Sequence, residues 1–318
     1  RAAFVLVTYP FLDNSLVMLF VLSFCIYTAT QFFAPAEAAS IPELISKENL
    51  VVANSLFMTT WIGSSVMGIG LGAPLVMFLG SAGTLTLSAG LYTAAGILLL
   101  FVPLPKRSRR SAGASETRPS VWNEVSMGIE FVRRNTVVAT ALIKMFVASA
   151  ALAVVSLLAL TFARDVLKIG EHNFGYLIFS AGAGMIAGTV FLSHFSHRIP
   201  KWLIAAGGFG ISGVFLILLA TVRDVGSALV VSFFLGFGDI LIVVVVQTIL
   251  QHYVPRPMRG RVFGIQNMLI NSAFTFPVVF FGGLADWIGL PVSFISRGVV
   301  VLMVGTLGML LPSFRAVQ

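Results

Sequence analysis

The stretch that decides the fold runs from Gly226 to His252 and reads GSALVVSFFLGFGDILIVVVVQTILQH. Asp239 is its only Asp, Glu, Lys or Arg residue. As a helix this stretch would extend about 40 Å, at ~1.5 Å per residue, which exceeds the ~30 Å hydrocarbon core of a bilayer. Its apolar residues are continuous and do not alternate with polar ones. The stretch therefore predicts a membrane-spanning helix.

Nine further stretches predict spans of the same kind. A spanning helix needs about 20 mostly apolar residues. Helices and closed barrels are the two structures that satisfy the backbone within lipid, and continuous apolar runs exclude the barrel. The sequence begins at Arg1 within such a run, so we expect N-terminal residues of the intact protein to be missing. The ten predicted spans are 2–12 (partial), 16–40, 50–79, 82–104, 137–162, 173–195, 202–222, 226–252, 262–288 and 291–311.

The composition indicates lipid as the main solvent. Hydrophobic residues make up 58% of the 318 residues and charged residues only 10%, whereas soluble domains carry about 25% charged residues. The net charge is +8, but the basic residues lie in short clusters between apolar runs. That distribution orients a membrane protein and does not indicate a nucleic-acid partner. Cys25 is the only cysteine, which excludes an intrachain disulfide and a cysteine-based metal site.

A polar connection at 105–135, basic at both ends, divides the chain. Within it, residues 120–134 predict an amphipathic helix. We expect this helix to lie on the membrane surface, with a solvated linker as the alternative. Its predicted apolar stripe consists of Trp122, Val125, Ile129 and Val132.

The connection predicts an all-α membrane fold of two half-bundles. Residues 1–104 form the N-terminal half, 105–135 the loop and 136–318 the C-terminal six-span half. If the halves are equal, the intact protein has twelve spans, and the first two and part of the third are missing. Basic residues gather on the side of the loop, whereas on the other side they accompany acidic ones, as Arg223 accompanies Asp224. The positive-inside rule then predicts a cytoplasmic loop and a cytoplasmic C-terminus.

A spacing repeats between the halves. Pro42 precedes Asn54 by the same number of residues as Pro255 precedes Asn267, and the two sites lie six predicted spans apart. This predicts parallel structural repeats, as in secondary transporters whose halves rock about a midplane site.

Several segments carry a family resemblance. Residues 31–44 read QFFAPAEAASIPEL, and ANSL follows at 53–56. Residues 251–255 read QHYVP, 259–264 read RGRVFG and 283–286 read GLAD. These segments resemble helices four to five and ten to eleven of the major facilitator superfamily, in the branch of the macrolide-efflux proteins and the enterobactin exporter. The resemblance covers essentially the whole chain, starting within helix three.

The resemblance implies a proton-driven antiporter that exports a hydrophobic or amphiphilic small molecule, of drug, macrolide or siderophore type. It implies alternating access, a bacterial inner membrane and no cofactor. Two features depart from the family pattern: residues 197–201 lack the usual acidic residue, and residues 63–74 lack the Gly-Pro pair of drug antiporters. An uptake symporter or lipid transporter of the same fold is one alternative, and a non-transporting membrane sensor or scaffold is another.

Asp239 and Lys144 are the clearest ionisable residues within predicted spans. Such a side chain costs at least ~2.5–3.5 kcal/mol on insertion scales, so it marks a functional site by default. Asp239 lies half-way along its span, and Lys144 lies in the span after the basic loop. They predict a proton or substrate site, with a static ion pair between the two helices as the alternative.

Other polar and small residues complete the candidate site. Gln31, Gln247, Asn267 and Asn271 could contact substrate or form interhelical hydrogen bonds. Glu37 could be protonatable, or pair with Arg259 or Arg261 in a gate. The alternatives are that its side chain extends to the membrane interface or forms a structural salt bridge. The remaining gating candidates are Asn54, Pro42, Pro255, Gly68 and Gly72.

Motifs of other functions are missing from the sequence. It contains no Gly-x-x-x-x-Gly-Lys-Ser/Thr loop and no His-Glu-x-x-His pair, and its four histidines are scattered. These absences argue against P-loop ATP binding and a zinc-peptidase site. We therefore expect no enzyme activity and no metal site.

Overall fold

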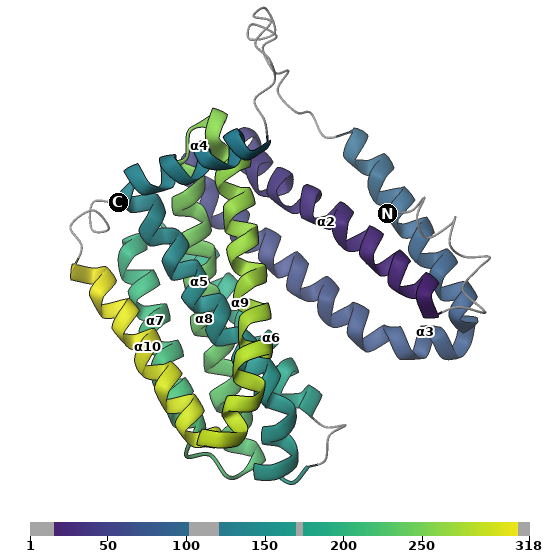
Figure 1. Ribbon diagram of the computed structural model, residues 1–318, viewed down its shortest axis with the longest axis vertical. Coiled ribbons are helices and arrows are strands. Elements are labelled where there is room, and N and C mark those ends of the chain that lie inside the picture. Colours follow the sequence, from purple (N-terminus) through teal and green to yellow (C-terminus); the bar gives the residue numbers. More distant parts are fainter. Residues whose placement is uncertain (1–15, 102–120, 170–173, 311–318) are drawn as a thin grey trace, which may run out of the picture. The chain divides into compact units, whose positions relative to one another are not determined.

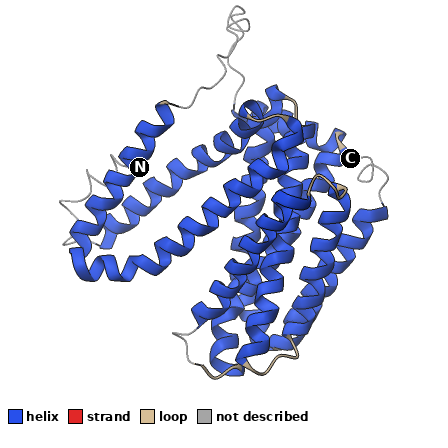
Figure 2. Cartoon of the chain, turned by 180° about the vertical axis from the view of Figure 1, so that it is seen from behind, coloured by secondary structure: helices blue, strands red, loops and turns tan. Residues whose placement is uncertain are grey.

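The computed structural model describes residues 16–101, 121–169 and 174–310, whose regular elements are all helical (Figures 1 and 2). This confirms the all-α prediction, although the predicted span 2–12 lies outside the described residues. Short 3-10 turns at Lys47–Asn49 and Arg256–Met258 precede two of the helices. The α-helices are α2 (Leu16–Leu44), α3 (Leu50–Leu100), α4 (Val121–Arg134), α5 (Thr136–Thr161), α6 (Gly175–Phe195), α7 (Lys201–Leu219), α8 (Val225–Tyr253), α9 (Arg259–Ile288) and α10 (Leu290–Leu310).

Helix α3 bends at Gly80. This residue has φ 68°, a backbone conformation that side chains with a Cβ rarely adopt, and the residues on both sides of it are helical. The sequence predicted two helices that meet between residues 79 and 82, so the break lies where it was expected.

Six helices within the described residues are long and apolar enough to cross a membrane. The predicted spans 16–40, 50–79 and 262–288 lie in α2, the first part of α3 and α9, which are helical but do not belong to this set. The six are Leu75–Leu100, Thr136–Val166, Gly175–Phe195, Lys201–Leu219, Val225–Tyr253 and Leu290–Leu307.

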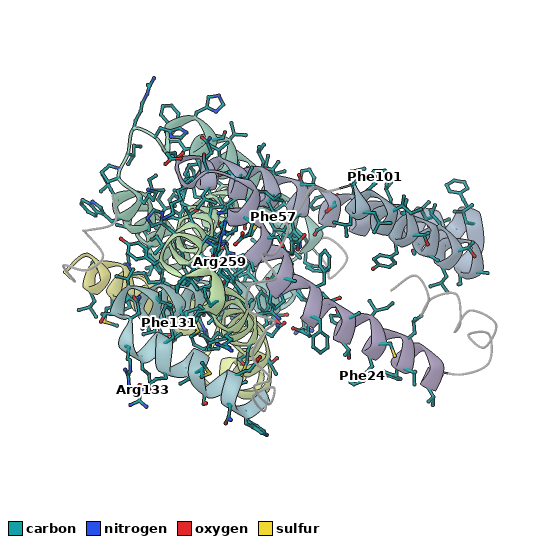
Figure 3. All side chains as sticks on the ribbon, turned by 90° about the horizontal axis from the view of Figure 1, so that it is seen from above. Phe24, Phe57, Phe101, Phe131, Arg133 and Arg259 are labelled. Atoms are coloured by element: carbon teal, nitrogen blue, oxygen red, sulfur yellow. The ribbon has the colours of Figure 1, made fainter. Side chains whose placement is uncertain are left out.

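The chain divides into two compact units. One contains residues 1–44 and 63–117, and the other contains 45–62 and 118–318. In the first unit, Leu22 of α2 and Ala89 of α3 are buried. Many large apolar side chains on these helices stay exposed, among them Phe24, labelled in Figure 3. Lipid is a solvent in which such exposure is stable.

The second unit contains a bundle of α5 to α10, with α4 across one end (Figure 1). Helix α8 packs against α5, α6 and α7, while α10 packs against α7 and α9 against α5. Most residues of α8 are buried, so α8 forms the centre of this bundle.

Glycines allow the backbones around α8 to touch. A Cβ added at Gly184 would lie 1.9 Å from the carbonyl oxygen of Phe233, and one added at Gly236 would lie 1.9 Å from that of Ala181. No larger residue fits at either position without separating α6 from α8. In membranes such small-residue contacts replace the hydrophobic effect as a source of helix association.

Candidate functional site

Asp239 lies in the middle of α8, at the centre of the bundle. Its side chain is 8% exposed. Among the described residues, none forms an ion pair with the Asp239 carboxylate or donates a hydrogen bond to it. The ion pair that the sequence left open as an alternative is thus not formed on this carboxylate. A buried carboxylate in such surroundings is costly to keep ionised.

Lys144 lies in α5 and is 4% exposed. Its Nζ lies 5.9 Å from the centroid of the Phe209 ring of α7. This is the range in which a cation is attracted to the face of an aromatic ring. Both predicted buried charges therefore belong to the same bundle and come from neighbouring helices, α5 and α8.

Polar side chains extend the surroundings of Asp239 along α8. Ser232 and Gln247 are both buried. Gln247 Oε1 accepts a hydrogen bond from Gln266 Nε2 of α9 at 2.5 Å. Gln266 Oε1 is buried and has no hydrogen-bond partner among the described residues. Gln266 was not predicted from the sequence; its signal was a third side-chain amide in the span that carries Asn267 and Asn271.

Asn54, at the start of α3, forms a buried polar cluster with the end of α8. Its Nδ2 donates to Gln251 Oε1 at 2.7 Å and to Thr248 Oγ1 at 3.0 Å. Gln251 Nε2 donates back to Asn54 Oδ1 at 3.2 Å. All three side chains are 1% exposed. We call Asn54, Thr248 and Gln251 the amide clasp.

A second contact adjoins the amide clasp. Thr59 Oγ1 donates to Thr189 Oγ1 of α6 at 2.6 Å. The first turns of α3 therefore attach by side-chain hydrogen bonds to both α8 and α6. The spacing of Pro42 and Asn54 in the sequence indicates Asn54 but carries no information on its partners Thr248 and Gln251, or on the contact of Thr59 with Thr189.

The predicted gate arginines lie at the start of α9, where α4 also packs. Arg261 pairs with Glu124 of α4 at 3.7 Å and donates to Met258 Sδ. Arg259 Nε donates to the carbonyl oxygen of Val254 at 3.3 Å, and Figure 3 labels this side chain. Glu124, which sequence reasoning did not select, is thus the carboxylate that meets Arg261.

The other predicted residues are spread over both units. Asn271 Nδ2 donates to the carbonyl oxygen of Asn267, so this pair bonds within α9. Pro255 precedes the 3-10 turn that leads into α9. A Cβ at Gly68 would meet no described atom within 4 Å, which gives no sign of close packing there. Gln31, Glu37 and Pro42 lie on α2 and Gly72 lies on α3, all in the first unit.

Metal ligands are not clustered in the part of the chain that the structure describes. Within it, no group of three or more His, Cys, Asp or Glu side chains could hold a metal ion. The chemistry available at the site is therefore that of buried charges, amides and hydroxyl groups.

Comparison with protein families gives one match. The model of the Major Facilitator Superfamily matches residues 2–278 and residues 153–316. The first of these matches alone covers most of the chain.

Comparison with curated proteins gives relatives at low identity. The chain is 24% identical over 294 residues to the uncharacterized MFS-type transporter YfmI of Bacillus subtilis (strain 168), covering 92% of this chain and 72% of that protein. It is also 24% identical over 291 residues to YfiS of the same organism, covering 87% and 67%. The multidrug efflux pump Tap of Mycolicibacterium fortuitum is 23% identical over 299 residues, covering 89% and 70%.

Proposed function

Because the chain belongs to the Major Facilitator Superfamily, whose members are multi-pass membrane transporters and not enzymes, we propose that it is a proton-driven exporter of a hydrophobic or amphiphilic small molecule. The similarity to a multidrug efflux pump supports export. The motifs shared with the macrolide-efflux and enterobactin-exporter branch support the same direction.

The observation that carries the proposal is the buried carboxylate of Asp239. It lies in the middle of a helix that is long enough to span a bilayer, and no described residue neutralises it. Such a carboxylate is stabilised by binding a proton or a cationic group. A site that gains and loses a proton within the membrane is what coupling to a proton gradient requires. Lys144, buried on a neighbouring helix of the same bundle, places a second ionisable group within the membrane-spanning region.

The amide clasp supports alternating access. It joins residue 54 from the predicted N-terminal half to residues 248 and 251 from the predicted C-terminal half. Interhelical hydrogen bonds in membranes contribute typically ~0.6 kcal/mol each. The clasp therefore stabilises one conformation by only a few kcal/mol, which is the scale of a reversible two-state equilibrium. We propose that it closes the cytoplasmic side and opens during each transport cycle.

The test uses the full-length protein in inverted membrane vesicles. A panel of macrolides, siderophores and lipophilic dyes is screened for accumulation driven by a proton gradient, with wild type beside Asp239→Asn and Asp239→Glu. Wild type and Asp239→Glu should accumulate at least one compound, and Asp239→Asn should not. Ser232→Ala, which changes a neutral side chain on the same face of α8, is the matched control and should retain accumulation.

Two outcomes would contradict the proposal. Accumulation only in right-side-out vesicles would indicate uptake. Accumulation that is equal in wild type and Asp239→Asn would remove Asp239 from the coupling mechanism.

A further inference from the structure

Helix α4 carries an apolar face that the described residues of its own unit leave largely exposed. Trp122 is 79% exposed, Val125 41% and Ile129 47%. Their spacing of three and four residues aligns them along one side of the helix. We call Trp122, Val125 and Ile129 the exposed stripe.

A different side of α4, the one that carries Gly128, packs against α9. Gly128 is buried, and a Cβ added there would lie 3.1 Å from Ile265 Cδ1 and 3.2 Å from Arg261 Cβ, both on α9. The pairing of Glu124 with Arg261 adds a polar contact to the same interface. These contacts fix the rotation of α4, so the exposed stripe points away from α9 because of packing and not by chance.

The position of α4 places the exposed stripe at a membrane boundary. Asn135 ends α4 and caps α5, accepting a hydrogen bond from Val138 N at 3.2 Å. The span Thr136–Val166 begins at the next residue. Farther along, Ile143 of α5 is 58% exposed, so apolar surface continues from α4 onto the span. Tryptophan is enriched at this level of membrane proteins, between headgroups and acyl chains.

The charges near the exposed stripe select the kind of membrane. Arg133 and Arg134 are exposed at the end of α4, and Figure 3 shows Arg133 pointing away from the bundle. Each basic residue near an anionic membrane surface favours binding by about fivefold.

We propose that α4 is a lipid-binding helix that inserts the exposed stripe into the headgroup boundary of the surrounding bilayer and binds anionic phospholipids through Arg133. Arg134 pairs with Glu130 of the same helix, so its charge is already matched by a carboxylate. An amphipathic helix of this kind lies in the plane of the membrane, with its apolar side buried and its basic side chains at the phosphates. Because α4 also packs on the start of α9, the bound lipid holds that end of α9 in place.

The test reads the environment of Trp122 directly. Trp61, Trp202 and Trp287, together with any tryptophan outside residues 1–318, are replaced by Phe in the full-length protein, so that Trp122 is the fluorophore. The protein is placed in nanodiscs of phosphatidylcholine, or of phosphatidylcholine with phosphatidylglycerol at 3:1, each with and without bromine on the acyl chains. Bromine quenching reports acyl-chain contact, and quenching by added iodide reports water.

We expect strong bromine quenching, stronger with phosphatidylglycerol, and little quenching by iodide. Ile129→Asp should lose most of the bromine quenching. Met127→Asp is the matched control: it adds the same charge at an exposed apolar position of α4 outside the exposed stripe, and it should keep the quenching. Arg133→Gln should reduce the advantage of phosphatidylglycerol by about fivefold and retain quenching in phosphatidylcholine.

Three outcomes would overturn the proposal. Strong iodide quenching without bromine quenching would show that α4 lies in water. Protection from both quenchers would show that protein, such as a second copy of this chain, covers the exposed stripe. Equal quenching of Ile129→Asp and wild type would show that the exposed stripe does not hold α4 to lipid. Size-exclusion chromatography in detergent confirms that each variant is folded.

Discussion

The side-chain amides of Asn54 and Gln251 exchange two hydrogen bonds between residues that are 197 positions apart in the sequence. Both side chains are only 1% exposed. An amide that loses its partner therefore cannot form a replacement hydrogen bond with water. The pair therefore joins the start of α3 to the end of α8, and its loss should leave a buried amide without a partner.

Replacing either amide of this pair should destabilise the protein. Asn54→Ala or Gln251→Ala leaves the other amide buried and unpaired, which costs about 1–3 kcal/mol. The double variant leaves neither amide orphaned, so its loss should be smaller than the sum of the two single losses. Thermal unfolding of the purified protein in detergent measures all three. Thr60→Ala, at an exposed position of the same helix, should change little, and strictly additive losses would contradict the pairing.

Asp239→Asn should raise thermal stability while abolishing proton-driven transport. The wild-type carboxylate is buried and has no described partner, so an amide of the same shape is cheaper to bury. Functional sites commonly give up stability in this way. Unfolding temperature and dye accumulation are measured on the same preparations. A fall in unfolding temperature would indicate that Asp239 has a structural role.

Gly184→Val should prevent normal packing of the bundle. Even the first carbon of the new side chain would lie 1.9 Å from the carbonyl oxygen of Phe233, so α6 and α8 must separate, and overpacking of this kind costs about 1–3 kcal/mol or more. Gly207→Val in α7 is the control, because a Cβ there meets no described atom within 4 Å. Expression level and the monodisperse fraction in detergent are compared. Equal behaviour of the two variants would refute the close contact of α6 and α8.

The stabilisation that Asp224 provides as the N-cap of α8 should be present at neutral pH and lost in acid. Its Oδ1 accepts a hydrogen bond from Ser227 N at 2.9 Å, and this bond, with the Ser227 hydroxyl, lowers the pKa of Asp224 below its usual value. A lowered folded-state pKa gives stability that is complete above the unfolded-state value of about 3.9 and is lost as pH falls through the folded-state pKa.

The comparison is between Asp224→Ala and Asp224→Asn. Asp224→Ala should lower the unfolding temperature at pH 7, with a deficit that shrinks below about pH 4. Asp224→Asn keeps a capping oxygen, so it should retain most of the stability at pH 7. A deficit of Asp224→Ala that is constant from pH 7 to pH 3 would contradict the assignment.

Topology can be tested with single cysteines in a Cys25→Ser background. The two ends of α8 lie on opposite sides of the bilayer if Val225–Tyr253 spans it. The variants Arg256→Cys and Arg198→Cys should each react with a membrane-impermeant maleimide only from the cytoplasmic side. The variant Asp224→Cys should react with this maleimide only from the opposite side. Labelling of positions 224 and 256 from one side would contradict the predicted topology.

The sequence by itself determined the helices, because lipid requires every backbone group of a span to be hydrogen-bonded within its own segment. A long apolar run therefore specifies a helix without reference to any neighbour. For this reason α5 to α10 were predicted to within a few residues, and the break at Gly80 was located. Asp239 and Lys144 were also found from sequence, since a charge in an apolar run is conspicuous.

Only the tertiary structure decided what each polar residue meets. The spacing of Pro42 and Asn54 selected a position in the fold, but the partners of Asn54 come from a helix about 200 residues away. The structure also shows that Gln266 donates a hydrogen bond to Gln247 and that Glu124 pairs with Arg261. Neither contact could be predicted from the sequence. Side-chain partners depend on how helices rotate and pack, and packing in a membrane follows from small-residue contacts that hydropathy does not register.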